Sequence, residues 1–306
     1  VRLVGSEMCI RDRVEALLRG EAGKRLRQRR VIRYDANVYP LQDAFAEALG
    51  VTPEELSTIH TAWSSFSLES SHFADKAALL RPLTEPHVRA RLQEVYDRLM
   101  LEVVVPDAAS VIPGTPANML KRGDVVGCDD GCSAVLYQAF PCVRVQQPCN
   151  FATIRPHTDD MYHHPRGTLN YYAPLVPLIT GGRTLQLEAA SGTSFVPLEL
   201  RHGELGRFAG AMDAHFTIAN DTGLCRVSLD MRAVPAQLYD PLSPTLLVPE
   251  TGKPAYAIGD YYSLAERGED GAWRKTVAGR VSERMGFPFV NSNYNNRRGG
   301  PIVAGA

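Results

Sequence analysis

The stretch RVSLDMRAV (residues 226–234) alternates between polar and apolar side chains. On an extended chain its polar members share one face and its apolar members the other: Arg226, Ser228, Asp230 and Arg232 against Val227, Leu229 and Met231. The apolar face is typical of a barrel strand covered by helices, and the polar face places a cation inside the barrel. A buried guanidinium needs a partner. The fork of Arg226 suits a carboxylate ligand, and the alternative is an ordinary ion pair with an acidic residue of the chain.

Short β-prone runs of the same kind fill residues 133–235 and are broken by Gly, Pro and Asn: AVLYQAF, CVRVQQ, TLNYYAPLV, RTLQLEA, SFVPLEL and LGRFAGA. Many short strands with close-set turns predict a sandwich or barrel.

Residues 14–100 have helical character instead. Thr52 and Glu55 form a capping box that is predicted to begin one helix. Thr84 is predicted to cap a second helix, in which apolar residues recur at helical spacing: Val88, Leu92, Val95 and Leu99.

This organisation predicts a helical region over residues 14–105, a β core over 106–265 and a C-terminal extension over 266–306 that ends in a mobile tail. Residues 1–13, VRLVGSEMCIRDR, resemble a translated sequencing adapter. We expect them not to belong to the natural protein and its natural N-terminus to be missing. Charged residues interrupt this segment, which argues against a signal peptide.

The composition limits the classes of partner. The 306 residues carry a formal net charge of −1, which gives no general attraction to nucleic acid or an anionic membrane. The basic run KRLRQRRVIR (residues 24–33) is interpreted as the solvated face of a helix. No apolar run is long enough to span a membrane.

The cysteines point to a reducing compartment. Five lie outside the first 13 residues, and an odd number without regular spacing favours the cytoplasm over a disulfide framework. Cys128 and Cys132 are interpreted as loop thiols rather than half of a zinc site.

The stretch RPHTDDMYHHP (residues 155–165) is rich in potential metal ligands. His157 and Asp159 lie two apart, so on an extended chain both can face one ion, whereas Asp160 faces the other way. Two imidazoles and one carboxylate form the facial set that binds non-haem Fe(II) and leaves three positions open. His215, which precedes a turn and the strand of Arg226, is the candidate for the second imidazole.

A rival pair is His202 with Glu204. His202 and Gly203 are predicted to form a hairpin turn, and the rival site would lack a further downstream histidine and arginine.

Taken together, these motifs resemble the Fe(II)/2-oxoglutarate-dependent oxygenases, in particular the bacterial branch that includes the streptomycin-biosynthesis type. The resemblance covers residues 136–235, one third of the chain, and is carried by LYQAFPCVRVQQP, HTDDMYHH, LNYYAPLVP, GRTLQLEA and LELRHGELGRFAGAMDAHFTIANDTGLCRVSLDMRAVP, with GDYYS further on. It implies a double-stranded β-helix (jelly roll), mainly β with α, with a helical N-terminal region.

The resemblance also implies roles for individual residues. His157, Asp159 and His215 become the iron ligands, and Arg226, assisted by Ser228, anchors the distal carboxylate of 2-oxoglutarate. Three further residues are candidates for cofactor binding, with a barrel-filling role as the alternative: Arg144, Asn170 and Thr184. His164 is either a residue of the substrate mouth or a surface histidine.

The implied activity is that of a dioxygenase using Fe(II), 2-oxoglutarate and O₂. It would hydroxylate an unactivated C–H bond of a small polar metabolite, such as an amino acid or natural-product intermediate, and release succinate and CO₂. The carboxylate of Asp159 favours hydroxylation over halogenation, while desaturation and ring closure stay open. The alternatives are a protein-modifying oxygenase and a non-catalytic jelly-roll or cupin-like binding protein. The helices and GDYYSLAERGEDGAW (residues 259–273) are expected to close over the mouth.

Overall fold

The computed structural model describes residues 2–64, 66–69, 78–113, 131–189, 192–248 and 252–280. Cys128 and the tail that was predicted to be mobile lie outside these residues. Within the described part of the chain, no helix has both the length and the apolar character needed to cross a membrane.

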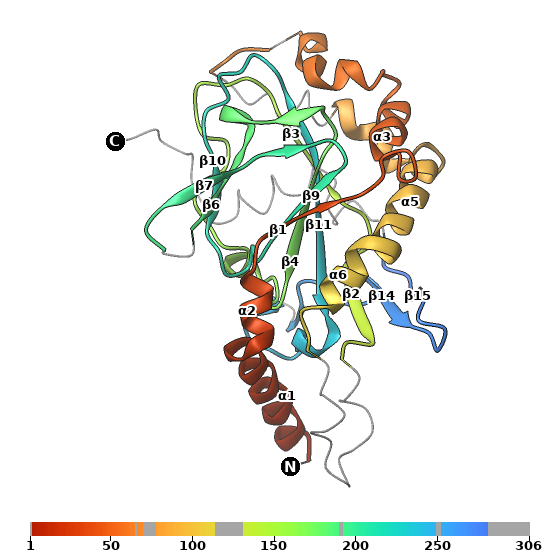
Figure 1. The fold of residues 1–306 in the computed structure, drawn as a ribbon, viewed down its shortest axis with the longest axis vertical. Coiled ribbons are helices and arrows are strands. Elements are labelled where there is room, and N and C mark those ends of the chain that lie inside the picture. The colour runs from red at the N-terminus through yellow and green to blue at the C-terminus, as the bar shows by residue number, and fades with distance from the viewer. Residues whose placement is uncertain are drawn as a thin grey trace.

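A large antiparallel sheet forms the centre of the molecule (Figure 1). Its strand order is β1 (Arg30–Arg33), β9 (Glu204–Phe208), β4 (Leu169–Pro174), β11 (Arg226–Pro235), β2 (Ala134–Gln138), β14 (Tyr262–Arg267) and β15 (Trp273–Val277). The long strand β11 pairs with β4 along one edge. Along the other edge it pairs first with β3 (Cys142–Gln146) and then with β2. The RVSLDMRAV stretch therefore lies in the middle of the sheet.

A smaller antiparallel sheet consists of β10 (His215–Thr217), β6 (Leu185–Glu188) and β7 (Phe195–Leu198). The chain before Asp159 runs beside β10, because His157 and His215 exchange both backbone hydrogen bonds, with N–O distances of 3.2 and 2.9 Å. Two short pairs complete the strands: β5 (Leu178–Ile179) with β8 (Leu200–Arg201), and β12 (Leu247–Val248) with β13 (Lys253–Pro254). The predicted double-stranded β-helix is confirmed.

Helices cover the outer face of the large sheet (Figure 1). The α-helices are α1 (Arg2–Arg19), α2 (Glu21–Arg27), α3 (Leu41–Leu49), α5 (Pro86–Leu99) and α6 (Val105–Ala109), with the π-helical turn η3 (Met100–Val104) between the last two. The 3₁₀ helices are η1 (Glu54–Ala62), η2 (Arg81–Thr84), η5 (Asp159–Tyr162), η6 (Gly181–Arg183) and η7 (Ala236–Leu238). Val227, Leu229 and Met231 are fully buried, as expected for the covered face of β11.

The helix starts were predicted with mixed success. The capping box is confirmed, since the Thr52 backbone N–H donates to Glu55 Oε2 at 2.7 Å and the Glu55 N–H to Thr52 Oγ1 at 3.4 Å. Thr84 was wrongly predicted as a cap. Its hydroxyl donates back to the Arg81 carbonyl at 2.8 Å, and α5 begins at Pro86 after Glu85.

Two other segments differ from expectation. The basic run at residues 24–33 is not one helix face, because α2 ends at Arg27 and residues 30–33 form the edge strand β1 paired with β9. Residues 259–273 were expected in the cover of the mouth, and most of them belong to the β14–β15 hairpin (residues 262–277), which extends the large sheet. Backbone pairing at a sheet edge decided both conformations, and the local sequence carries no signal for it.

A buried ion pair joins the helical layer to the sheet. Arg207 of β9, whose side chain is 1% exposed, donates to Asp107 of α6 at 3.0 Å. Asp107 also accepts from Tyr171 at 2.8 Å and from Arg30 at 3.1 Å. One carboxylate therefore links α6 with strands β9, β4 and β1.

Asp107→Ala is expected to lower the free energy of unfolding by about 3–5 kcal/mol, because it leaves the Arg207 guanidinium buried without an opposite charge. Urea denaturation monitored by circular dichroism measures the loss. Asp270→Ala, which breaks the exposed Asp270–Arg274 pair, is the control and should leave the midpoint unchanged. Equal, small shifts in both variants would contradict the assigned role of Asp107.

Candidate metal centre

His157, Asp159 and His215 converge from two segments that are far apart in the sequence. One nitrogen of each imidazole and one carboxylate oxygen all lie within 4.8 Å of one another. Asp159 Oδ1 is 3.6 Å from His157 Nε2 and 3.7 Å from His215 Nε2. The antiparallel bridge between the two histidines fixes this arrangement, because directly opposite residues project to the same side.

The backbone orients both imidazoles. His157 Nδ1 lies 2.8 Å from the carbonyl of Arg155, and His215 Nδ1 lies 3.1 Å from the carbonyl of Asp213. A carbonyl only accepts, so Nδ1 carries a proton in each ring, and the neutral form of each ring presents its lone pair at Nε2. Both lone pairs are then available to a metal beside Asp159, and a hydrogen bond to the other ring nitrogen is the usual support of a histidine ligand.

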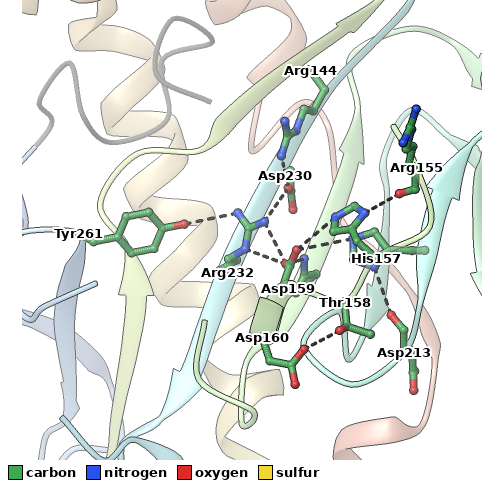
Figure 2. Close-up of polar contacts among 12 residues, drawn as sticks. Arg144, Arg155, His157, Thr158, Asp159, Asp160, Asp213, Asp230, Arg232 and Tyr261 are labelled. Atoms are coloured by element: carbon green, nitrogen blue, oxygen red, sulfur yellow. Dashed lines mark hydrogen bonds and ion pairs between the residues drawn. The ribbon is translucent and has the colours of Figure 1, made fainter. Parts of the chain in front are cut away.

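The Asp159 carboxylate divides its contacts between its two oxygens (Figure 2). Oδ1 faces the imidazoles, whereas Oδ2 accepts from Asn170 Nδ2 at 2.8 Å and from Arg232 Nε and Nη2 at 3.2 and 3.0 Å. Burial alone would raise the pKa of Asp159, but the charge of Arg232 and the contact with His157 hold this pKa well below its usual value. The carboxylate is therefore ionised, as a metal ligand must be.

On the side of Asp159 that faces away from the imidazoles, positively and negatively charged side chains alternate. Arg232 also pairs with Asp230 at 3.2 Å and donates to the Tyr261 hydroxyl at 3.4 Å, and Asp230 pairs with Arg144 at 3.3 Å. Burial alone would lower the pKa of Arg232, but Asp159 and Asp230 raise it well above its usual value. Arg144, predicted as a cofactor residue, thus lies on β3 beside β11 with part of its side chain exposed.

Arg226 is buried without a carboxylate partner among the described residues. Its Nη1 donates to the Arg183 carbonyl at 3.3 Å, its guanidinium lies 5.9 Å from the centre of the Tyr172 ring, and its Nε has no hydrogen-bond partner. Burial lowers the pKa of Arg226, which reflects a cation without a matching anion. Ser228, on the same face of β11, donates to the Tyr172 hydroxyl at 2.6 Å. The ordinary ion pair considered as an alternative for Arg226 does not form with any acidic residue in the described part of the chain.

Asn170 and Thr184 have protein partners. Asn170 contacts the Asp159 carboxylate rather than standing apart from the metal ligands. Thr184 donates to the Gly181 carbonyl at 2.8 Å and accepts from Gln186 Nε2 at 2.8 Å, so its hydroxyl is used within its own turn.

The remaining candidates lie apart from the ligand set. Asp160 accepts from Thr158 and takes no part in the cluster. His163 adopts a left-handed backbone conformation (φ 69°), and its Nδ1 lies 2.8 Å from the Thr245 carbonyl. His202 lies in the turn between β8 and β9, and the rival ligand Glu204 pairs with Arg33.

His164 is not a surface histidine. Its ring is buried and stacks on Tyr256 with 3.9 Å between ring centres, and its Nδ1 has no hydrogen-bond partner. Burial and the charge of Arg232 hold the pKa of His164 well below its usual value, so the ring is neutral.

Sequence reasoning missed the contacts of Arg232, Tyr261 and Tyr172. The alternation of β11 had placed Arg232 on the inner face, and this was the available signal. Its partner is the candidate ligand Asp159, 73 positions away, and no local pattern encodes that pairing.

No family model matches the chain. The chain is 32% identical over 210 residues to the "Streptomycin biosynthesis protein StrG" of Streptomyces griseus, a match that covers 69% of this chain and 86% of that protein. The chain belongs to the StrG family.

The solved structures similar to this StrG-family chain include the apo form of the non-haem monooxygenase ThoJ and the non-haem α-ketoglutarate-dependent epimerase SnoN from nogalamycin biosynthesis. ThoJ has 14% identity and a TM-score of 0.43, covering 90% of this chain and 93% of its own. SnoN has 17% identity and a TM-score of 0.43, covering 82% of this chain and 98% of its own. Likenesses of this size establish no shared activity.

The stability of the protein should fall at acid pH partly through His164. A histidine whose pKa is lowered on folding contributes stability that is complete above its unfolded value of about 6.5 and is lost as the pH falls below it, by up to about 1.4 kcal/mol per pH unit. His164→Phe keeps the stacking on Tyr256 and should reduce the loss in unfolding free energy between pH 7.5 and 5.5, measured by urea denaturation. An undiminished acid loss in His164→Phe would show that His164 is not buried as the neutral ring.

Proposed function

We propose that this protein is an Fe(II)- and 2-oxoglutarate-dependent oxygenase. One observation carries the proposal: a His–Asp–His cluster shares the barrel interior with a buried guanidinium, that of Arg226, which has no carboxylate partner among the described residues. The first fits a metal ion and the second fits the carboxylate of an organic anion.

The donor set fits iron better than calcium, magnesium or a structural zinc ion. Calcium and magnesium prefer sites built from oxygen ligands, and a structural zinc site is closed by four protein ligands, often cysteines. Two imidazoles and one carboxylate with open positions suit non-haem Fe(II). When bound, iron with 2-oxoglutarate and O₂ would supply the oxidising chemistry, with release of succinate and CO₂.

The protein's own residues would bind and orient these groups. In this proposal His157 Nε2, His215 Nε2 and Asp159 Oδ1 hold the metal. Arg226 supplies the positive charge for the far carboxylate of 2-oxoglutarate, in a buried position where water does not screen it.

Neighbouring hydroxyl groups add to the proposed carboxylate site. The Ser228 and Tyr172 hydroxyls are bonded to each other close to Arg226 and can rotate to accommodate a bound oxygen. Arg144, opposite Ser228 on the adjacent strand β3, places a second guanidinium near this site, with its charge paired to Asp230.

The substrate is proposed to be a small polar metabolite such as a natural-product intermediate, in keeping with the antibiotic-biosynthesis name of the StrG relative. Hydroxylation of a C–H bond is the proposed outcome, because Asp159 occupies the ligand position that would otherwise take a halide. His164, buried next to the aromatic rings of Tyr256 and Tyr261, is proposed to lie at the substrate side of the metal.

Anaerobic titration of the Fe(II)-loaded protein with 2-oxoglutarate tests the cofactor assignment. The chelate should give a weak visible charge-transfer band in the wild type. Arg226→Ala should raise the dissociation constant for 2-oxoglutarate by roughly 30-fold or more, equal to about 2 kcal/mol, because it removes one partner of a buried charge pair. Arg226→Lys should be intermediate, since a lysine keeps the charge but not the planar fork.

Arg201→Ala is the control, because Arg201 lies exposed on β8, and it should leave the titration unchanged. A folded, iron-loaded wild type without a band would eliminate the oxygenase and favour a binding protein. A band of equal strength in Arg226→Ala would move the 2-oxoglutarate anchor elsewhere.

A further inference from the structure

The two oxygens of Asp159 have different surroundings. Oδ2 receives three N–H groups, one from Asn170 and two from Arg232, all at 2.8–3.2 Å. A carboxylate offers about two lone-pair sites on each oxygen. Oδ2 is therefore saturated by protein donors, while Oδ1 faces the two imidazole Nε2 atoms.

We propose that Arg232 is a positioning residue that restricts Asp159 to binding metal through Oδ1 alone. The inference rests on the proposed function, because it concerns the same metal site. A carboxylate that is free to rotate can bind a metal through both oxygens. With Oδ2 held by Arg232, Asp159 occupies one coordination position, and the three positions needed for 2-oxoglutarate and O₂ stay open.

Arg232 is itself held in place from behind. Its Nη2 pairs with Asp230 at 3.2 Å and its Nη1 contacts the Tyr261 hydroxyl at 3.4 Å, while its side chain is only 7% exposed. Figure 2 shows Arg232 between Tyr261 and Asp159, with the His157 imidazole on the far side of the carboxylate. Rotation of Asp159 would break two hydrogen bonds to a guanidinium that has no room to follow.

Asn170 completes the restriction from the neighbouring strand β4, where it lies directly opposite Arg232 of β11. The Asn170 side chain can take this position beside Asp159 only because residue 210 is a glycine. A Cβ at Gly210 would lie 2.7 Å from Asn170 Oδ1, which is too close for any real side chain. Gly210 also accepts the Asp159 backbone N–H at 2.7 Å. The backbone and side chain of Asp159 are therefore held independently.

In a purely structural role, Arg232 would only neutralise buried charge. This role and the proposed positioning role predict different experimental results. Neutralisation alone affects stability and metal affinity. The restriction of Asp159 also sets how many positions on the metal are left for water, which can be counted.

The test uses Mn(II) as a probe in the full-length protein without 2-oxoglutarate. The broadening of the Mn(II) electron paramagnetic resonance signal in ¹⁷O-enriched water reports the number of bound waters. The wild type should hold about three waters and Arg232→Met about two, because Asp159 Oδ2 enters the coordination sphere. Arg232→Lys offers one donor atom in place of two and should fall between them.

Arg207→Met and Arg207→Lys are the matched controls. Arg207 is also a buried arginine bound to an aspartate, but its partner Asp107 lies in the helical layer. These controls should lose stability and keep about three waters. If either methionine variant does not fold, the lysine pair carries the comparison.

The outcomes separate the inference from the proposed function. An unchanged or larger number of waters in a folded, Mn(II)-bound Arg232 variant overturns the positioning role, even if its Mn(II) affinity has dropped. Failure of the wild type to bind Mn(II), or full binding by His215→Ala, overturns the metal site itself. A water number that falls in the Arg232 variants alone supports the inference.

Discussion

The structure depends on compensating the charges that β11 brings into the barrel. Arg226, Asp230 and Arg232 are all buried on one face of that strand, and uncompensated charge in such a place costs several kcal/mol. Asp230 and Asp159 compensate Arg232, and Arg144 completes the alternation. Arg226 is left without a carboxylate among the described residues, so the anion that completes the interior is expected to come from a ligand.

The same arrangement holds the side chains of the candidate metal site in fixed positions without a metal. Backbone carbonyls fix both imidazoles, an antiparallel bridge fixes their separation, and Arg232 with Asn170 fixes the carboxylate. A site that is already ordered loses little conformational entropy on binding. The conformational entropy of these side chains is lost during folding, and the burial of Val227, Leu229 and Met231 on the opposite face of β11 helps to offset that loss.

Much of this was predictable from the sequence, because polar and apolar residues alternate along these strands even where both faces of the strand are buried. The strands of the β core, the outer face of β11 and the pairing of His157 with Asp159 followed from it, whereas His215 was chosen from its position before the strand of Arg226 and from the family resemblance. What escaped prediction depends on contacts between distant segments. The pairing of β1 with β9 turned part of a basic run into a strand, and the contact of Asn170, a candidate for cofactor binding, with Asp159 was not anticipated.

The central claim is that His157, Asp159 and His215 form one metal site, and its most direct test is equilibrium dialysis of the apo-protein against Fe(II) under anaerobic conditions. The wild type should bind about one ion per chain, and alanine at any of the three positions should weaken binding at least about tenfold. His163→Ala, which removes a histidine from the same stretch without touching the cluster, should bind as the wild type does. Unweakened binding in the variants of the three proposed ligands, or a loss confined to His163→Ala, would contradict the account.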